Sequence, residues 1–339
     1  MSHQPIRFYQ TGTFTVGNRL LDPALRTVQS DTERANSLTS GHRACQGCGE
    51  ALGARYAVDA AVRATQGNLI VVNATGCLEV FSTPYPESSW QVPWMHSLFG
   101  NAPAVASGVA AALKVQGKSH IRVLAQGGDG GTTDIGLGCL SGMFERNDDV
   151  LYLCYDNEAY MNTGVQRSSA TPAGARTATT PAAGPEPGAP FGQGKNLPLI
   201  AMAHGIPYVA TASVANLHDL ERKVEHAMDL RGSRYIHVHV PCPLGWGSEP
   251  ADTMKVARMA VESGLFPLYE AEYGEVANRV PIRKLVPVNA YLKLQRRFAH
   301  LFKPVEDHLR LAAIQGIADR NIRRFGLLPD EKPMEAEND

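Results

Sequence analysis

Two short polar segments, each directly after an apolar run, carry side chains suited to binding a metal ion and a phosphate group. Gly128-Asp129-Gly130 follows the run at 121–126, and Asp156-Asn157-Glu158 follows the run at 150–155. If both runs are parallel strands of one sheet, their carboxyl ends open at the same edge, where ligands bind. Glycines let the backbone approach phosphate oxygens, and a helix beginning near Asp134 would direct its first N–H groups toward an anion.

The same two segments offer oxygen ligands for Mg²⁺. Asp129 and Asn157 supply side-chain oxygens of the kind that Mg²⁺ prefers. A backbone carbonyl near Ala159, two diphosphate oxygens and a water molecule would complete the coordination. The spacing, with 26 residues (131–156) between Gly130 and Asn157, is similar to the thiamine diphosphate motif. Either half alone is ordinary, because Gly-Asp-Gly is common in turns and Asp-Asn often ends a strand.

Four cysteines form a second candidate site. Cys45 and Cys48 make a C-x-x-C pair around a glycine-containing turn, Cys77 follows the first strand and Cys242 follows the last one. At the carboxyl edge of a parallel sheet, four thiolates could bind a [4Fe–4S] cluster or a tetrahedral zinc ion. Spacing alone does not choose between them, and buried cysteines without a metal stay an alternative for Cys77 and Cys242.

Bulk composition excludes several classes of protein. The 339 residues are 44% hydrophobic and 19% charged with a net charge of −1, which argues against binding to nucleic acid or to a membrane surface. No apolar run approaches the ~20 residues of a membrane span, and the first residues lack a signal peptide's apolar region. A cytoplasmic location is therefore expected. Six cysteines in so long a chain predict no disulfide framework, and Cys139 and Cys154, in apolar stretches, are interpreted as small core residues.

The elements that must position these residues alternate along the chain. Strands are predicted at 69–73, 121–126, 150–155, 208–210 and 235–240, and helices at 51–66, 103–115, 134–145 and 216–230. This alternation predicts an α/β fold, a doubly wound and mainly parallel sheet with helices on both faces. The expected division is an N-terminal arm (1–40), a cofactor domain (41–250) with a Pro/Gly/Ala-rich loop (171–198), and a C-terminal arm (251–339) contacting partner subunits.

These features together resemble the β subunit of pyruvate:ferredoxin oxidoreductase and its 2-oxoacid relatives. The resemblance covers roughly residues 5 to 305 and implies the thiamine-diphosphate-binding fold. Its matching stretches include GHRACQGCGEAL, VVNATGCLEVFSTPYP, VPWMHSLFGNAPAVASGVAAAL, QGGDGGTTDIGLGCLSGMFERNDDVLYLCYDNEAYMNTGVQRSSATPAGA, VPCPLGWG and YLKLQRRFAHL. One departure is Gln46, which stands between two cysteines where many relatives have proline.

The resemblance implies a role for each matching residue. The [4Fe–4S] ligands would be Cys45, Cys48, Cys77 and Cys242, and the Mg²⁺ ligands Asp129, Asn157 and the carbonyl of Ala159. Contacts to thiamine diphosphate would come from Gly76, Cys77, Gly128, Asp129, Gly130, Gly131, Asn157, Asn162, Thr163 and Gln166. The glutamate that activates the cofactor is expected on a partner α subunit, so no catalytic acid or base is assigned in this chain.

The activity implied is oxidative decarboxylation of a 2-oxoacid, with pyruvate the first choice, to an acyl-coenzyme A and CO₂. Thiamine diphosphate would act as the electron sink, and electrons would leave through the cluster. Expected partners are the α subunit, a γ subunit, and a ferredoxin-like δ subunit or ferredoxin. Aromatic or branched 2-oxoacids such as phenylglyoxylate, and NAD as final acceptor, remain open, as does the physiological direction. Other classes also remain open: a thiamine enzyme without redox chemistry, an electron-transfer iron–sulfur subunit, and a zinc-stabilised interaction subunit.

Some charged residues near these motifs receive ordinary interpretations. Glu50 and Glu79 are expected to make local hydrogen bonds, and His96, near Trp94, either to face the active site or to pack. The basic amphipathic stretch 291–302 is predicted as a helix, either docked on a partner or solvated.

Overall fold

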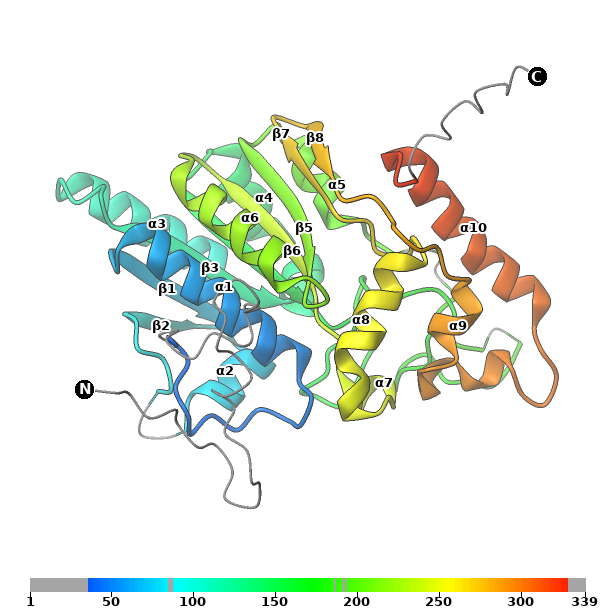
Figure 1. Ribbon diagram of the computed structural model, residues 1–339. Coiled ribbons are helices and arrows are strands. Elements are labelled where there is room, and N and C mark those ends of the chain that lie inside the picture. Colours follow the sequence, from blue (N-terminus) through cyan, green and yellow to red (C-terminus); the bar gives the residue numbers. More distant parts are fainter. Residues whose placement is uncertain (1–35, 85–87, 186, 191, 193, 329–339) are drawn as a thin grey trace, which may run out of the picture. The chain divides into compact units, whose positions relative to one another are not determined.

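A single eight-stranded sheet forms the centre of the protein. The structure, a computed structural model, describes residues 36–84, 88–185, 187–190, 192 and 194–328. The strand order is β2-β1-β3-β4-β6-β5-β7-β8 (Figure 1). Strands β1 to β6 pair in parallel, whereas β7 pairs antiparallel with β5, and β8 antiparallel with β7. The predicted α/β fold with a mainly parallel sheet is thereby confirmed.

The strands are β1 Leu69–Ala74, β2 Trp94–Ser97, β3 Arg122–Gly128, β4 Val150–Asp156, β5 Tyr208–Ser213, β6 Arg234–His239, β7 Tyr269–Glu272 and β8 Glu275–Arg279. The α-helices are α1 Gly49–Thr65, α2 Cys77–Ser82, α3 Ala102–Val115, α4 Leu137–Glu145, α5 Leu197–Ala203, α6 Leu217–Asp229, α7 Pro243–Trp246, α8 Thr253–Glu262, α9 Val288–Leu292 and α10 His308–Phe325. A π-helix, η4, spans Gly130–Ile135, and 3₁₀-helices η5 and η6 span Pro250–Asp252 and Arg296–Leu301.

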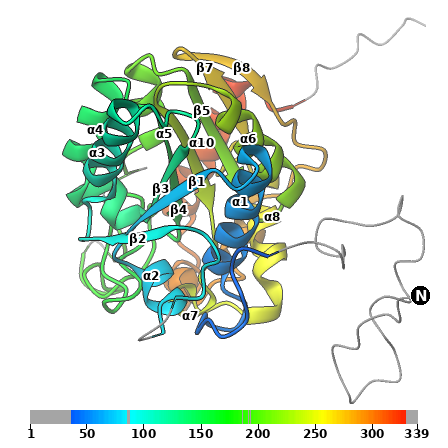
Figure 2. The same ribbon diagram turned by 90° about the vertical axis from the view of Figure 1, so that its left-hand side faces the viewer.

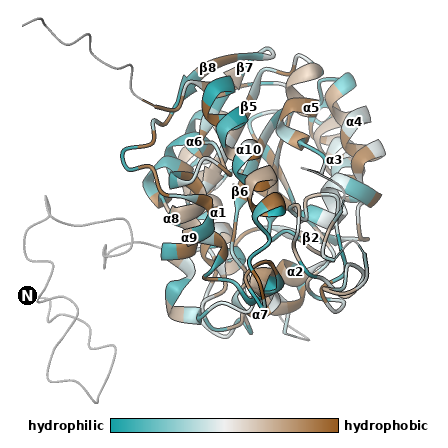
Figure 3. Cartoon of the chain, turned by 90° about the vertical axis from the view of Figure 1, so that its right-hand side faces the viewer, coloured by the Kyte–Doolittle hydropathy of each residue, from teal (hydrophilic) through white to brown (hydrophobic). Residues whose placement is uncertain are grey.

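Helices cover both faces of the sheet. α1 and α6 lie against one face, and α3, α4 and α5 lie against the other (Figure 2). The strands read as nearly continuous apolar runs because a parallel sheet is buried on both faces. On the second face, Val72 and Tyr152 pack with Phe144 of α4 in one cluster of buried residues. In Figure 3 apolar and polar residues alternate on helices such as α4 and α10, as expected for helices with one face on a core.

The part of the chain after Asp252 is more regular than its sequence indicates. α8, α9, η6 and α10 share a second apolar core that includes Trp246 and Ala175, and the hairpin β7–β8 extends the sheet. Residues 1–35 and 329–339, which hold most of the predicted N-terminal arm and the end of the chain, lie outside the described residues. Both the domain boundaries and the contact of 251–339 with partners stay predictions.

Three local expectations differ from the structure. The helical segment predicted at 134–145 begins earlier, as η4 at Gly130. The sequence predicts a later start because Gly130 and Gly131 are poor helix formers. Cys77 is the first residue of α2 and does not lie in a loop. The stretch predicted as one helix at 291–302 is divided between α9 and η6, since the backbone of Gln295 is extended.

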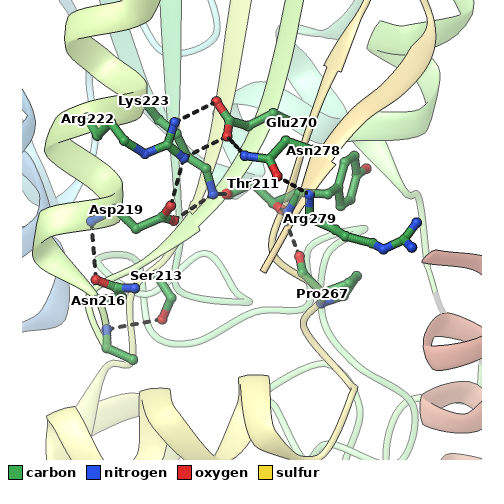
Figure 4. Close-up of polar contacts among 12 residues, drawn as sticks. Thr211, Ser213, Asn216, Asp219, Arg222, Lys223, Pro267, Glu270, Asn278 and Arg279 are labelled. Carbon is green, nitrogen blue, oxygen red and sulfur yellow. Dashed lines mark hydrogen bonds and ion pairs between the residues drawn. The ribbon is translucent and has the colours of Figure 1, made fainter. Parts of the chain in front are cut away.

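A cluster of charged side chains, buried except for the half-exposed Arg222, links the antiparallel hairpin to α6 (Figure 4). Glu270 of β7 accepts hydrogen bonds from Arg222 Nη2 and from Tyr208 Oη, both at 2.6 Å. Lys223, fully buried, pairs with Asp219 at 2.6 Å. β7 has only four residues, so few backbone hydrogen bonds join it to the sheet. The side-chain bonds add to this short pairing.

No helix in the described ranges is long and apolar enough to cross a membrane.

Candidate cofactor site

The two polar segments meet at the carboxyl edge of the sheet. β3 and β4 are adjacent, and Gly128 pairs with Tyr155 one residue before β4 ends. A cavity of about 80 Å³ opens where they end. Its lining includes Gly76, Cys77, Gly128, Asp129, Gly130, Gly131, Asn157, Ala159, Asn162 and Thr163, joined by Glu50, Thr75, Phe99, Tyr160 and Met161. The fold therefore gathers every predicted cofactor contact except Gln166 around one cavity.

The side chain of Asn157 is oriented by a buried carboxylate. Asn157 Nδ2 donates to Glu50 Oε2 at 3.0 Å, and its Oδ1 is buried without a hydrogen-bond partner among the described residues. Burial raises the pKa of Glu50 to about 7, although the bond from Asn157 opposes the rise. In its ionised form Glu50 can only accept hydrogen bonds, so it takes the amide N–H and leaves the carbonyl oxygen of Asn157 for a cation.

Asp129 and Ala159 complete the oxygen set. Asp129 is 1% exposed, and one of its carboxylate oxygens accepts a hydrogen bond from the hydroxyl of Ser168. Burial, with nearby Asp156, raises the pKa of Asp129 well above its usual value, and a bound cation would reverse that effect. The Ala159 carbonyl accepts from Met161 N at 2.9 Å and keeps a second lone pair. The residues present thus fit Mg²⁺ as ligands.

Close packing beside the cavity explains one glycine. A Cβ at Gly130 would lie 2.5 Å from the ring of Tyr160, so no larger residue fits without moving that ring. Tyr160 Oη in turn donates to Asp134 Oδ2 at 3.1 Å. The free N–H groups at the start of a helix, expected near Asp134, belong instead to η4, which begins at Gly130 directly after Asp129.

Gln166 lies behind the lining. Its Oε1 accepts from Thr163 Oγ1 at 2.6 Å and its Nε2 donates to Thr163 O at 2.8 Å. In the structure Gln166 braces Thr163, which does line the cavity.

The four candidate cysteines line a neighbouring cavity of about 100 Å³, which also includes Glu50, Asn157 and Asn162. Cys48 and Cys242 accept hydrogen bonds from the N–H groups of Ala51 and Gly245, both at 3.4 Å. Burial raises the pKa of Cys48 to about 12, and also raises that of Cys242. All four thiols are free. Within the described part of the chain, however, no three His, Cys, Asp or Glu side chains are close enough to hold one metal ion.

Backbone packing brings the C-x-x-C loop to the last cysteine. Gly49 N donates to Pro241 O at 3.1 Å, and a Cβ at Gly49 would lie 2.6 Å from that oxygen. This close approach sets Cys48 beside the segment that carries Cys242. Glycine at position 49 is therefore required by this close approach of the two backbone segments.

Other singled-out residues have simpler surroundings. Glu79 accepts from Thr83 Oγ1 at 3.1 Å, a local bond as predicted. His96 is exposed, stacks on Trp94 and bonds Thr75 Oγ1 at 2.7 Å. Cys154 is fully buried, as expected for a core residue. Cys139 is only half-buried, because α4 turns it away from the apolar cluster.

Sequence reasoning missed three contacts at this site. Glu50 was expected to bond locally, but it binds Asn157, 107 residues away. Ser168 bonds Asp129, and Arg297, from the C-terminal basic stretch, bonds Glu158. No local sequence pattern could have predicted these three contacts, since each joins residues that are distant in the chain.

A larger cavity of about 140 Å³ lies on the other side of residues 156–158. Its lining is mostly apolar and comes largely from the segments around α8, α9 and α10. None of the predicted site residues lines it. The turn at 156–158 therefore separates two cavities.

Known proteins are similar to this chain. Residues 74–238 match the family model described as "Thiamine pyrophosphate enzyme, C-terminal TPP binding domain". The chain is 52% identical to "Pyruvate synthase subunit PorB" of Methanosarcina barkeri over 299 residues, covering 88% of this chain and 99% of that protein. It is 44% identical to "Ketoisovalerate oxidoreductase subunit VorB" of Pyrococcus abyssi, covering 78% of this chain and 86% of the relative.

A solved 2-oxoacid oxidoreductase structure is among those with a similar fold. It is the 2-oxoglutarate:ferredoxin oxidoreductase from Magnetococcus marinus, described with 2-oxoglutarate, coenzyme A and succinyl-CoA bound. The TM-score is 0.50 at 25% identity, with 64% of this chain and 77% of that chain covered.

Proposed function

The chain belongs to the family of pyruvate synthase and related 2-oxoacid oxidoreductase β subunits, and we propose that it is the subunit that holds thiamine diphosphate in such a complex. The observation that carries the proposal is the cavity at the carboxyl edge of β3 and β4, which gathers the predicted diphosphate and Mg²⁺ contacts. The family model matched by residues 74–238 is itself a thiamine diphosphate-binding domain.

Each residue group has a distinct proposed task. Asp129, Asn157 and the Ala159 carbonyl would hold Mg²⁺, and Gly128 and Gly130 would let the backbone approach the diphosphate. The cofactor, when bound, supplies the electron sink for decarboxylation of a 2-oxoacid. The chain's own contribution is binding and orientation. A partner α subunit would complete the site and supply the activating carboxylate.

A [4Fe–4S] cluster at Cys45, Cys48, Cys77 and Cys242 is proposed as the first electron acceptor. Support comes from the position of the cysteine cavity, which shares Cys77 and Glu50 with the cofactor cavity. Backbone N–H groups already point at two of the sulfurs, a feature that tunes cluster potentials. Electrons leaving the substrate would therefore have a short path out.

Pyruvate is the proposed substrate and coenzyme A the proposed acyl acceptor. Relatives named pyruvate synthase reach 52% identity, and those named ketoisovalerate oxidoreductase reach 44%. The solved relative is described with coenzyme A bound. A branched 2-oxoacid is thus the second candidate. We further propose γ and ferredoxin-like δ partners and a cytoplasmic location.

A substrate panel tests this function. The chain would be co-expressed with its partner subunits, purified without oxygen, and assayed for coenzyme A-dependent viologen reduction with pyruvate, 2-oxoisovalerate, 2-oxoglutarate and phenylglyoxylate. Fastest turnover of pyruvate is expected. Preference for 2-oxoisovalerate would change the substrate but keep the reaction. No activity from a preparation that holds iron and thiamine diphosphate would reject the reaction itself.

A further inference from the structure

The turn that carries two proposed Mg²⁺ ligands contains a strained residue. Glu158 lies between Asn157 and Ala159 and has a φ of 67°, in the left-handed region. Outside glycine this conformation costs roughly 1–2 kcal/mol, and it persists only where the surroundings enforce it. Glycine would adopt it freely. A glutamate here indicates that its side chain has a task.

The side chain of Glu158 is bound by a residue of the C-terminal region. Arg297 of η6 donates a hydrogen bond to Glu158 Oε2, and both side chains are largely buried, at 4% and 12% exposure. His239 Nε2 lies 3.6 Å from Glu158 Oε1. The backbone of Glu158 is held too, because its carbonyl accepts from Thr171 Oγ1 at 2.6 Å. The turn is therefore fixed at both its side chain and its main chain.

Arg297 also reaches the residue before Glu158. Its guanidinium lies 3.8 Å from the ring centroid of Trp246, and Trp246 Nε1 donates to Asn157 O at 2.8 Å. Gln295 Oε1 accepts from Arg297 Nε at 2.9 Å, which orients the guanidinium plane. Arg297 thus contacts the turn in two ways. It bonds the side chain of Glu158 directly, and it stacks on Trp246, which bonds the backbone of Asn157.

The surroundings explain why the turn needs such a hold. Behind it lies the 140 Å³ cavity, lined by Asp156 and Glu158 among others, so packing from behind is incomplete. A buried ion pair is in itself a weak source of fold stability, since desolvation offsets the attraction. Fixing one conformation of the turn is a better account of the pair.

We propose that Arg297 is a positioning residue that, through Glu158 and Trp246, holds the Asn157–Ala159 turn in the conformation that binds Mg²⁺ and diphosphate. The inference rests on the proposed function, because the turn matters only if the cofactor binds there. It assigns the basic stretch at 291–302 an internal task in this chain, where sequence reasoning allowed only a partner contact or a solvated face.

The test measures cofactor affinity in the assembled complex. Complexes carrying Arg297→Met, Arg297→Lys or Arg296→Met would be depleted of thiamine diphosphate and titrated with it at several Mg²⁺ concentrations, followed by circular dichroism. Arg297→Met should raise the Kd at least tenfold and increase the Mg²⁺ requirement. Arg297→Lys, which keeps the charge, should recover part of the loss. Arg296→Met is the matched control, because Arg296 is exposed and should bind as wild type does.

A second pair of variants separates positioning from folding. Glu158→Gly relieves the strained φ but removes the contact with Arg297. It should therefore raise the Kd, although glycine adopts the left-handed conformation of the turn more easily. Glu158→Gln combined with Arg297→Met should cost less than the sum of the single changes, since both break one contact. These variants also serve if Arg297→Met fails to assemble.

Two results would overturn the inference. If Arg297→Met and Glu158→Gly lower the melting temperature but leave the Kd and Mg²⁺ dependence unchanged, the pair only stabilises the fold. If the wild-type complex itself binds no thiamine diphosphate, both the inference and the proposed function fail. Binding by wild type with unchanged binding by the variants rejects the inference alone.

Discussion

At the scale of single residues, Glu50 connects the two candidate sites. It lines both cavities and holds the amide of Asn157. A carboxylate in this place fixes which end of the Asn157 side chain faces a cation. Its function is therefore one of orientation, which differs from the local hydrogen bonding expected from the sequence.

Replacing Glu50 tests this orientation. Glu50→Leu removes the acceptor and lets the Asn157 amide turn, so thiamine diphosphate binding should weaken about tenfold, given that an unsatisfied buried donor costs roughly 1–3 kcal/mol. Glu50→Gln keeps a carbonyl acceptor and should weaken binding much less. Titration of the depleted complex with thiamine diphosphate measures both. Equal losses in Leu and Gln variants would show that charge, and not the hydrogen bond, is what matters.

The cysteine site allows a direct metal prediction. Cys242→Ala removes one of four proposed ligands. The complex should therefore lose most of the iron and of the brown absorbance that this subunit contributes. Cys139→Ala is the control, because Cys139 is half-buried on α4 and does not line the cysteine cavity. Iron analysis and the visible spectrum of anaerobically purified complexes report the result. Full iron in the Cys242 variant would remove this residue from the ligand set.

Residues in continuous motifs could be predicted from the sequence, and those that act across the fold could not. The sequence could bring Asp129 and Asn157 to one cavity because each directly follows a strand, and the edge of a parallel sheet brings such positions together. Ser168 and Arg297 have no comparable marker. Their partners, Asp129 and Glu158, lie 39 and 139 residues away, and only the folded chain brings them together.

At the scale of elements, five of the six parallel strands were predictable, whereas the short, largely exposed parallel strand β2 and the antiparallel hairpin were not. Buried strands such as β3 and β4 show as apolar runs, whereas β8 is exposed throughout and offers no apolar pattern. β7 carries Glu270, whose polar character argues against a strand until its partners are known. Tertiary contacts to α6 decide its structure, and a local pattern cannot contain them.

The Glu270 cluster makes a pH-dependent prediction for the hairpin. Burial raises the pKa of Glu270, but hydrogen bonds from Arg222, Tyr208 and Asn278 outweigh this and lower it to about 2. Because the folded pKa is below the unfolded value of about 4.3, the stabilisation is complete above pH 4.3 and is lost as the pH falls toward 2. The contribution of Glu270 to hairpin stability should therefore not change between pH 7 and pH 5.

Glu270→Gln should weaken the hairpin by about 2 kcal/mol, as expected for losing hydrogen bonds to a charged carboxylate, since Glu270 is 7% exposed although its partner Arg222 is 44% exposed. Hydrogen–deuterium exchange of residues 269–279 in the complex, corrected for intrinsic rates, should be faster in the variant by the same factor at pH 7 and pH 5. Exposed Glu272→Gln, on the same strand, is the control. A difference that shrinks already at pH 5 would contradict the low pKa.

At the scale of the whole molecule, large apolar side chains are exposed beside the cofactor cavity. Leu98 is 76% exposed and precedes Phe99, which lines the cavity. Ile135, at the end of η4, is 63% exposed and lies next to Gly100 of the same loop. A cofactor cavity rimmed by such side chains is suited to coverage by another subunit, because burying each leucine or isoleucine stabilises contact by about 1.5–3 kcal/mol.

Leu98→Asp should therefore weaken assembly with the proposed α subunit, by tenfold or more, while leaving the fold of this chain intact. Val115→Asp is the matched control: Val115 is 88% exposed but ends α3, a helix that runs back toward the amino ends of the parallel strands and so away from the cavity. Co-purification of the partner and size-exclusion chromatography would measure the effect. If Val115→Asp impaired assembly and Leu98→Asp did not, the partner would dock at the opposite edge, and the cofactor cavity would have to be closed by this chain alone.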